Sequence, residues 1–285
     1  MLPLTIWMIL IFYIPILGNV IAFQDYSIPK GFINSKWVGL KHFKSFFSSD
    51  LAMTLIRNTL AMSILSLIFG TIASVAFAIL LNEIYQANFK RFVQTVSYLP
   101  YFISMAVCAN MFINLLSRTG PLNNILISLG LLKEGIPFLE SEGLYWIVLT
   151  IQNIWKSIGW NAILYLAAIA GISYETYEAA FVDGAGRLRL MWNITLPAIV
   201  PTIAILLVMN SGSVIMGNFE QQYLMFNPMV MDVAEVISTY VYKRGMGAMQ
   251  FSFATAVGIF QSVVSFILLI LVNKASKKLT DVSLW

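Results

Sequence analysis

Six apolar runs dominate this sequence, and each is long enough to cross about 30 Å of hydrocarbon as an α-helix. The runs cover roughly residues 2–24, 57–82, 92–117, 144–171, 195–219 and 251–273. Only 11% of the 285 residues are charged and 59% are hydrophobic, whereas about 25% of the residues in a soluble globular protein are charged. Because so little polar surface cannot shield a core from water, lipid must surround much of the chain. We expect an all-α, polytopic membrane protein with six transmembrane helices, forming a single domain over residues 1–285.

The residues that usually carry catalysis are scarce. Cys108 is the single cysteine and lies in an apolar run, so no intrachain disulfide can form. The single histidine, His42, leaves almost no material for a metal site or a Ser-His-Asp triad. No glycine is followed by lysine, so the phosphate-binding P-loop is missing. We predict that the chain is not an enzyme, holds no metal or cofactor, and relies on another chain if ATP is used. Its formal charge of +4 is spread over short loops, which does not suit a nucleic-acid binder.

An even number of spans places both termini on the same side of the membrane. That side would hold segments 83–91 and 172–194 and the tail from Lys274, with basic residues close to the spans. Basic residues in short loops are typical of the cytoplasmic side, so we expect both termini and segment 172–194 in the cytoplasm. The opposite side has longer, aromatic-rich loops, which either anchor at lipid headgroups or form a landing surface for an outside partner.

Polar residues share one face of the fourth run, where Gln152, Asn153, Lys156 and Trp160 recur at helical spacing. Polar groups at membrane depth are costly and therefore need partners or water. Two interpretations remain open for Lys156. It snorkels or pairs with a neighbouring helix, or it lines a cavity in which amides and an ammonium meet a hydroxylated or acidic solute.

The fifth run carries Asn210 and Asn218 near its outer half. Pro197 and Pro201 interrupt its start, and we expect a helix to restart at Leu196-Pro197, since proline is tolerated in a first turn. Either a cavity wall or plain helix packing fits this pattern. Asp and Glu are absent from the middle of every run, which argues against a proton-coupled carrier.

Between the fourth and fifth runs, the segment from Tyr174 to Met191 becomes amphipathic. Ala179 and Ala180 leave little side chain, so another surface can approach the backbone closely. Gly184 permits a sharp change of direction. By themselves, these residues describe a short surface helix that lies at headgroups or meets a partner.

The order EAA (178–180), three residues, Gly184, nine residues and ITLP (194–197) resembles the EAA signature of permease subunits from ABC importers. Asp183 and Ala185 fit the common DGA extension of that signature. The last third of the chain is similar to permeases of the carbohydrate-uptake group, in particular to subunits that import complex oligo- or polysaccharides, such as the alginate importer.

The resemblance implies a coupling helix that inserts into a cleft on an ATPase subunit. The coupling residues would be Glu178, Ala179, Ala180, Asp183, Gly184 and Arg187. The candidates for the substrate pathway are Gln152, Asn153, Lys156, Trp160, Asn210 and Asn218.

The resemblance also implies the surroundings of the chain. It would lie in the bacterial cytoplasmic membrane, in contact with lipid, beside a second homologous permease. Two nucleotide-binding ATPase subunits would hold ATP and Mg, and an extracytoplasmic solute-binding protein would deliver an oligo- or polysaccharide, acidic and alginate-like. The alternatives are a neutral oligosaccharide or other solute, or an ATP-independent secondary transporter.

Overall fold

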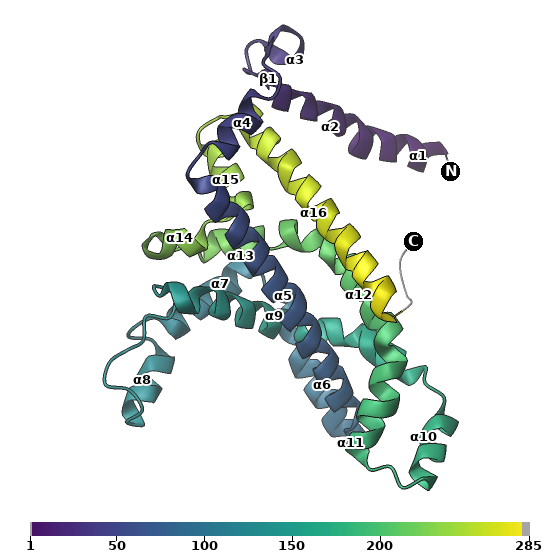
Figure 1. Ribbon diagram of the computed structural model, residues 1–285. Helices are drawn as coiled ribbons and strands as arrows, with labels where there is room; N and C mark the ends of the chain where they lie inside the picture. The colour runs from purple at the N-terminus through teal and green to yellow at the C-terminus, as the bar shows by residue number, and fades with distance from the viewer. Residues whose placement is uncertain (1, 281–285) are drawn as a thin grey trace. The chain divides into compact units, whose positions relative to one another are not determined.

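The computed structural model describes residues 2–280, and this part of the chain is almost entirely helical (Figure 1). Helices long and apolar enough to cross a membrane cover Pro3–Phe23, Leu51–Asn82, Arg187–Ser213 and Phe251–Lys278. Two helix pairs meet the same criteria with a bend of 102° in Ala87–Phe102 + Met105–Ser128 and of 72° in Glu142–Ala170 + Tyr174–Val182. If each bent pair is one span, the described residues contain six, as the apolar runs predict.

The chain separates into two compact units. One unit comprises the chain up to Thr59 together with Glu235–Ser265, and the other comprises Leu60–Ala234 together with the chain from Phe266. Helices α5 (Leu51–Asn82) and α16 (Phe251–Thr280) contribute residues to both units. The single permease domain over residues 1–285 stays a prediction.

The first unit begins with an apolar helical stretch whose side chains are exposed on all sides, as expected for a helix surrounded by lipid. Its elements are α1 (Leu2–Met8), η1 (Ile9–Tyr13), α2 (Ile14–Leu17) and η2 (Gly18–Phe23). A short antiparallel pair follows, β1 (Gln24–Asp25) with β2 (Lys36–Trp37), around α3 (Gly31–Asn34). The core lies between α4 (Lys41–Phe47), α15 (Ile237–Tyr242) and the first turns of α5 and α16, where Phe46, Leu55 and Val257 are buried. The turn η5 (Lys243–Gly247) precedes α16.

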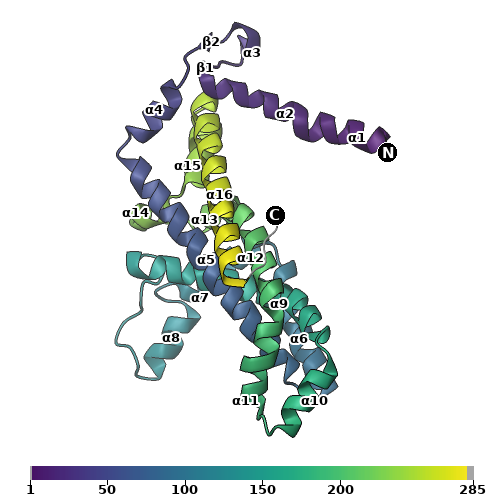
Figure 2. The ribbon, with the colours of Figure 1, turned by 45° about the vertical axis from the view of Figure 1, so that its right-hand side comes forward.

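The second unit contains the remaining helices, and α6 (Ala87–Phe102) lies along α9 (Glu142–Ala170) (Figure 2). Its buried core is formed by α5, α9 and α12 (Leu196–Gly217), through Val75, Ala162, Tyr165 and Ile199. The shorter elements are α7 (Met105–Leu116), α8 (Pro121–Ser128), α10 (Tyr174–Val182), α11 (Arg187–Leu190), η3 (Met191–Thr195), α13 (Phe219–Leu224), η4 (Pro228–Val230) and α14 (Met231–Ala234).

The third span is not the straight helix that the apolar run 92–117 suggests. Helix α6 ends at Phe102, and α7 begins after Ser104, whose hydroxyl accepts a hydrogen bond from the Val107 amide at 3.3 Å. Pro100 lies in the last turn of α6 and removes one helical amide donor. The proline and the serine cap together explain why the two helices meet at 102°.

Helix α12 begins at Leu196 with Pro197 in its first turn, as expected, but it follows the preceding helical turns without a break. Helix α11 begins at Arg187 and continues through the π-helical turn η3 into α12, so one helix covers Arg187–Ser213. The Leu196 amide donates to the Met191 carbonyl in the wider π pattern. This local widening lets the chain pass Pro197, which has no amide donor, without ending the helix.

Candidate functional site

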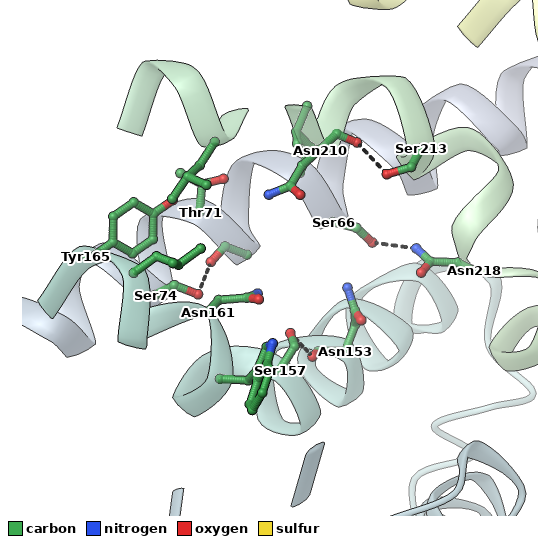
Figure 3. A pocket seen from close by; sticks show the side chains of 15 residues that line it. Ser66, Thr71, Ser74, Asn153, Ser157, Asn161, Tyr165, Asn210, Ser213 and Asn218 are labelled. Atoms are coloured by element: carbon green, nitrogen blue, oxygen red, sulfur yellow. Dashed lines mark hydrogen bonds between the residues drawn. The ribbon is translucent and has the colours of Figure 1, made fainter. Parts of the chain in front are cut away.

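A cavity of about 380 Å³ lies in the second unit between α5, α9 and α12 (Figure 3). Each helix contributes side chains at spacings of three to five residues, which places them on one face. The polar lining residues are Ser66, Thr71, Ser74, Asn153, Ser157, Asn161, Tyr165, Asn210, Ser213 and Asn218. Among the described residues, none that lines this cavity carries a formal charge.

The hydroxyls of Ser74, Ser157 and Ser213 donate to carbonyls of their own helices, whereas the Ser66 hydroxyl accepts from Asn218. Ser74 donates to the Gly70 carbonyl at 2.8 Å, and Ser157 donates to the Asn153 carbonyl at 2.7 Å. Their oxygens therefore retain lone pairs that can accept hydrogen bonds from a solute. The amides of Asn153, Asn161 and Asn210 point into the cavity (Figure 3). The cavity thus offers neutral donors and acceptors from three helices.

One aromatic wall borders the cavity at Trp160, a residue that is 42% exposed. Its ring stacks on Tyr101 with centroids 4.5 Å apart and an interplanar angle of 5°. Phe102 meets the same ring edge-on at 5.8 Å. The last residues of α6 therefore set the orientation of a lining residue on α9.

Four of the six predicted pathway residues, Asn153, Trp160, Asn210 and Asn218, lie together at this cavity. Asn218, which follows α12, donates to the Ser66 hydroxyl at 3.5 Å. The stripe from α5 was missed. The available signal was the set of small residues at helical spacing, Ser66, Gly70, Thr71 and Ser74.

Gln152 and Lys156 lie outside the lining. They belong to a neighbouring stripe of α9, about 100° around the helix from Asn153 and Ser157, and this stripe reaches the cavity at Trp160. Gln152 is fully buried. Its amide donates to the Cys108 sulfur at 3.4 Å and accepts from Gln221 at 2.8 Å. This buried network joins α7, α9 and α13.

Lys156 faces the break between α6 and α7. Its Nζ donates to the carbonyls of Pro100 at 3.3 Å, of Tyr101 at 3.0 Å, and of Ile103. Of the two interpretations that the sequence left open, the geometry favours pairing with a neighbouring helix.

The segment with the EAA pattern is exposed. Helix α10 has no buried residue among those described, and Phe181 and Val182 are 73% and 85% exposed. Glu178 and Ala179 are exposed, and Ala180 is half-buried. A hydrogen bond of 2.9 Å between the Tyr177 and Thr195 hydroxyls ties this helix to η3.

A tight turn follows α10. Gly184 adopts φ +78°, a backbone conformation that favours glycine. Asp183 and Arg187 flank this turn with exposed side chains, and the Arg187 guanidinium lies 4.8 Å from the centre of the Tyr85 ring. The structure thus places all six predicted coupling residues at one exposed turn and helix.

Residues 66–281 match the family model described as "Binding-protein-dependent transport system inner membrane component". The chain belongs to this family. It is the permease subunit of an ABC importer, a transport component of several membrane-crossing helices, in line with the resemblance of its EAA pattern. This membership does not favour the alternative of an ATP-independent secondary transporter.

Relatives of the permease align over nearly its whole length. Protein LplB of Bacillus subtilis (strain 168) is 42% identical over 279 residues, which cover 98% of this chain and 87% of LplB. The polygalacturonan/rhamnogalacturonan transport system permease protein YteP of the same strain is 43% identical over 278 residues, 97% of this chain and 86% of YteP.

The permease also matches solved structures. A crystal structure of a bacterial alginate ABC transporter, in complex with a periplasmic protein that holds an alginate pentasaccharide, contains a chain with a TM-score of 0.89 and 38% identity. The match covers 99% of this chain and 94% of that chain. The permease fold expected from the sequence is therefore confirmed.

Proposed function

We propose that this permease forms half of the pathway of an ATP-driven importer for an oligo- or polysaccharide. The observation that carries the proposal is the cavity lined by amides, hydroxyls and Trp160. Each sugar hydroxyl is both a donor and an acceptor, so a neutral lining of this composition can pair with it. The apolar face of a sugar ring can pack on the exposed indole.

The proposed cargo is acidic and alginate-like. Two similar proteins support this choice, since YteP is named for polygalacturonan/rhamnogalacturonan and the bacterial alginate transporter imports an acidic polysaccharide. The amide and hydroxyl donors of the cavity can bind a carboxylate. Lys156 gives no support, because its ammonium group binds backbone carbonyls. A neutral oligosaccharide is the second candidate, favoured by the uncharged lining.

The proposed partners are two ATPase subunits that hold ATP and Mg, a second homologous permease and an extracytoplasmic solute-binding protein. In this arrangement, segment 172–194 and both termini lie in the cytoplasm of a bacterial cell. The exposed apolar side chains of α10 would dock on an ATPase subunit, with Glu178 as a polar contact and the small residues Ala179 and Ala180 allowing close approach.

One continuous helix would couple the motion of the ATPase subunits to the cavity. The hydrogen bond between Tyr177 and Thr195 joins α10 to the helix Arg187–Ser213, which also carries Asn210 into the cavity. A rigid helix can transmit a displacement of the ATPase subunits to the lining residues. Net import requires that the two states of the cavity bind the cargo differently.

The test uses the complete assembly in proteoliposomes, with its binding protein and radiolabelled trigalacturonate or maltotriose as probes. We expect ATP-dependent uptake of trigalacturonate. Asn210→Leu should lower it roughly tenfold or more, because a cargo hydroxyl loses its partner, whereas Asn114→Leu, on an exposed asparagine outside the cavity, should not. Uptake of maltotriose alone would select the neutral cargo. Equal effects of the two variants would reject the cavity as the pathway.

A further inference from the structure

The break between α6 and α7 leaves few amide donors for the backbone carbonyls at the end of α6, where the Pro100 carbonyl accepts a backbone bond from the Ile103 amide at 3.2 Å. The last carbonyls of any α-helix lack an amide from the following turn, and such groups need partners at membrane depth. Here the side chain of Lys156 supplies them, with bonds to Pro100, Tyr101 and Ile103. An ammonium group has three N–H donors, and the three carbonyls match that number.

The same end of α6 carries the aromatic wall of the cavity. Tyr101 binds Lys156 through its carbonyl and Trp160 through its ring. Lys156 and Trp160 are four residues apart on α9 and therefore lie on the same side of that helix. Between them, Gly159 lets α6 come close, since a Cβ there would lie 2.2 Å from the Ser97 carbonyl oxygen.

We propose that Lys156 is a positioning residue, which holds the broken end of α6 so that Tyr101 and Phe102 fix the Trp160 ring at the cavity. Lys156 then acts on the cargo through Trp160 and does not bind a cargo carboxylate. The position of the Trp160 ring is a property of the protein without cargo. The effect of Lys156 on the cargo rests on the proposed function, because it concerns the saccharide that would contact Trp160.

The first experiment needs no cargo. The fluorescence of Trp160 in the purified assembly is obtained by subtracting the spectrum of the Trp160→Phe counterpart in each background. In Lys156→Met the three carbonyls lose the ammonium donor, and in the described part of the chain the carbonyl of Pro100 alone keeps a backbone bond, from Ile103. We therefore expect Trp160 to become at least about twofold more accessible to acrylamide. Lys156→Arg should keep the wild-type signal, because guanidinium also offers several donors.

The matched control is Lys133→Met, which makes the same chemical change at an exposed lysine. If Lys156→Met does not assemble, Lys156→Gln, whose amide keeps two N–H donors, is measured in the same way. An unchanged Trp160 signal in the Lys156 variant, or an equal change in Lys133→Met, would overturn the proposal.

The second experiment measures binding of trigalacturonate and of its methyl ester to the same assemblies. If Lys156 acts through Trp160, Lys156→Met weakens both probes by the same factor, and it has no further effect in the Trp160→Phe background. A loss confined to the acidic probe would show direct carboxylate binding and refute the positioning role. If the wild-type assembly binds neither probe, the proposed function fails, while the fluorescence result still decides whether Lys156 positions the ring.

Discussion

Two glycines of the second unit are required for different reasons. At Gly159, the neighbouring helix occupies the space of a side chain, since an added Cβ would lie 2.2 Å from the Ser97 carbonyl oxygen. At Gly184, no atom lies within 4 Å of an added Cβ, but φ is +78°. The first position is therefore limited by packing and the second by backbone conformation, so the same substitution has different consequences at the two sites.

Gly159→Ala tests the packing limit. We expect the methyl group to push α6 away from α9 and to destabilise the assembly by about 1–3 kcal/mol, as overpacked sites do. The measurement is the thermal unfolding midpoint of the purified assembly. Gly143→Ala is the matched control, because it lies on the same helix with open space around an added Cβ. Equal midpoints for the two variants would contradict the close approach of α6 and α9.

At the scale of elements, α10 stands out as a short helix with an exposed apolar surface and one hydrogen bond, from Tyr177, to the helix that follows. Because α10 packs little against the rest of the unit, the turn at Gly184 largely determines the direction in which α10 points. The turn therefore matters for coupling more than for the stability of the unit.

Gly184→Val tests this view. A β-branched residue in the left-handed region is strained by about 1–2 kcal/mol, so we expect the turn to change and ATP-driven uptake to fall at least about tenfold. The ATPase activity of the assembly would then no longer respond to the loaded binding protein. Gly186→Val is the control, since Gly186 has φ –74° and open space. Wild-type uptake by both variants would argue against the assignment of α10 as the coupling helix.

Across the whole molecule, the sequence predicts the number of membrane-crossing helices better than it predicts where those helices bend or continue. Hydropathy reports the length of an apolar run, so six runs correspond to the six spans counted with bent pairs. It does not report direction, so the bend after Phe102 and the continuous helix through Pro197 were not predicted. Both depend on which backbone groups find partners, including the Lys156 side chain, which is distant in sequence.

The candidate site was predicted in part for a related reason. Periodicity identified a polar side of α9 that includes both Asn153 and Lys156. Which of the two stripes on that side faces the cavity depends on where α6 packs, and Gly159 decides this through a contact with Ser97. The EAA pattern, in contrast, is local in sequence and identified the exposed turn and helix directly.

The uncharged lining of the cavity has an electrical consequence. Because this chain contributes no formal charge to the lining in its described part, it does not neutralise the charge of an acidic cargo. Moving one negative charge inward against an inside-negative potential of about 100 mV requires about 2.3 kcal/mol. A sugar with three carboxylates would require about 7 kcal/mol on the same basis.

Import of an acidic saccharide should therefore be electrogenic. We expect an inside-negative diffusion potential, imposed on proteoliposomes with potassium and valinomycin, to slow uptake of trigalacturonate and to leave uptake of its methyl ester unchanged. Equal rates for the acidic probe with and without the potential would mean that co-transported cations carry the compensating charge. The neutral amides and hydroxyls between α5, α9 and α12 thus make the membrane voltage a determinant of how fast a charged sugar enters.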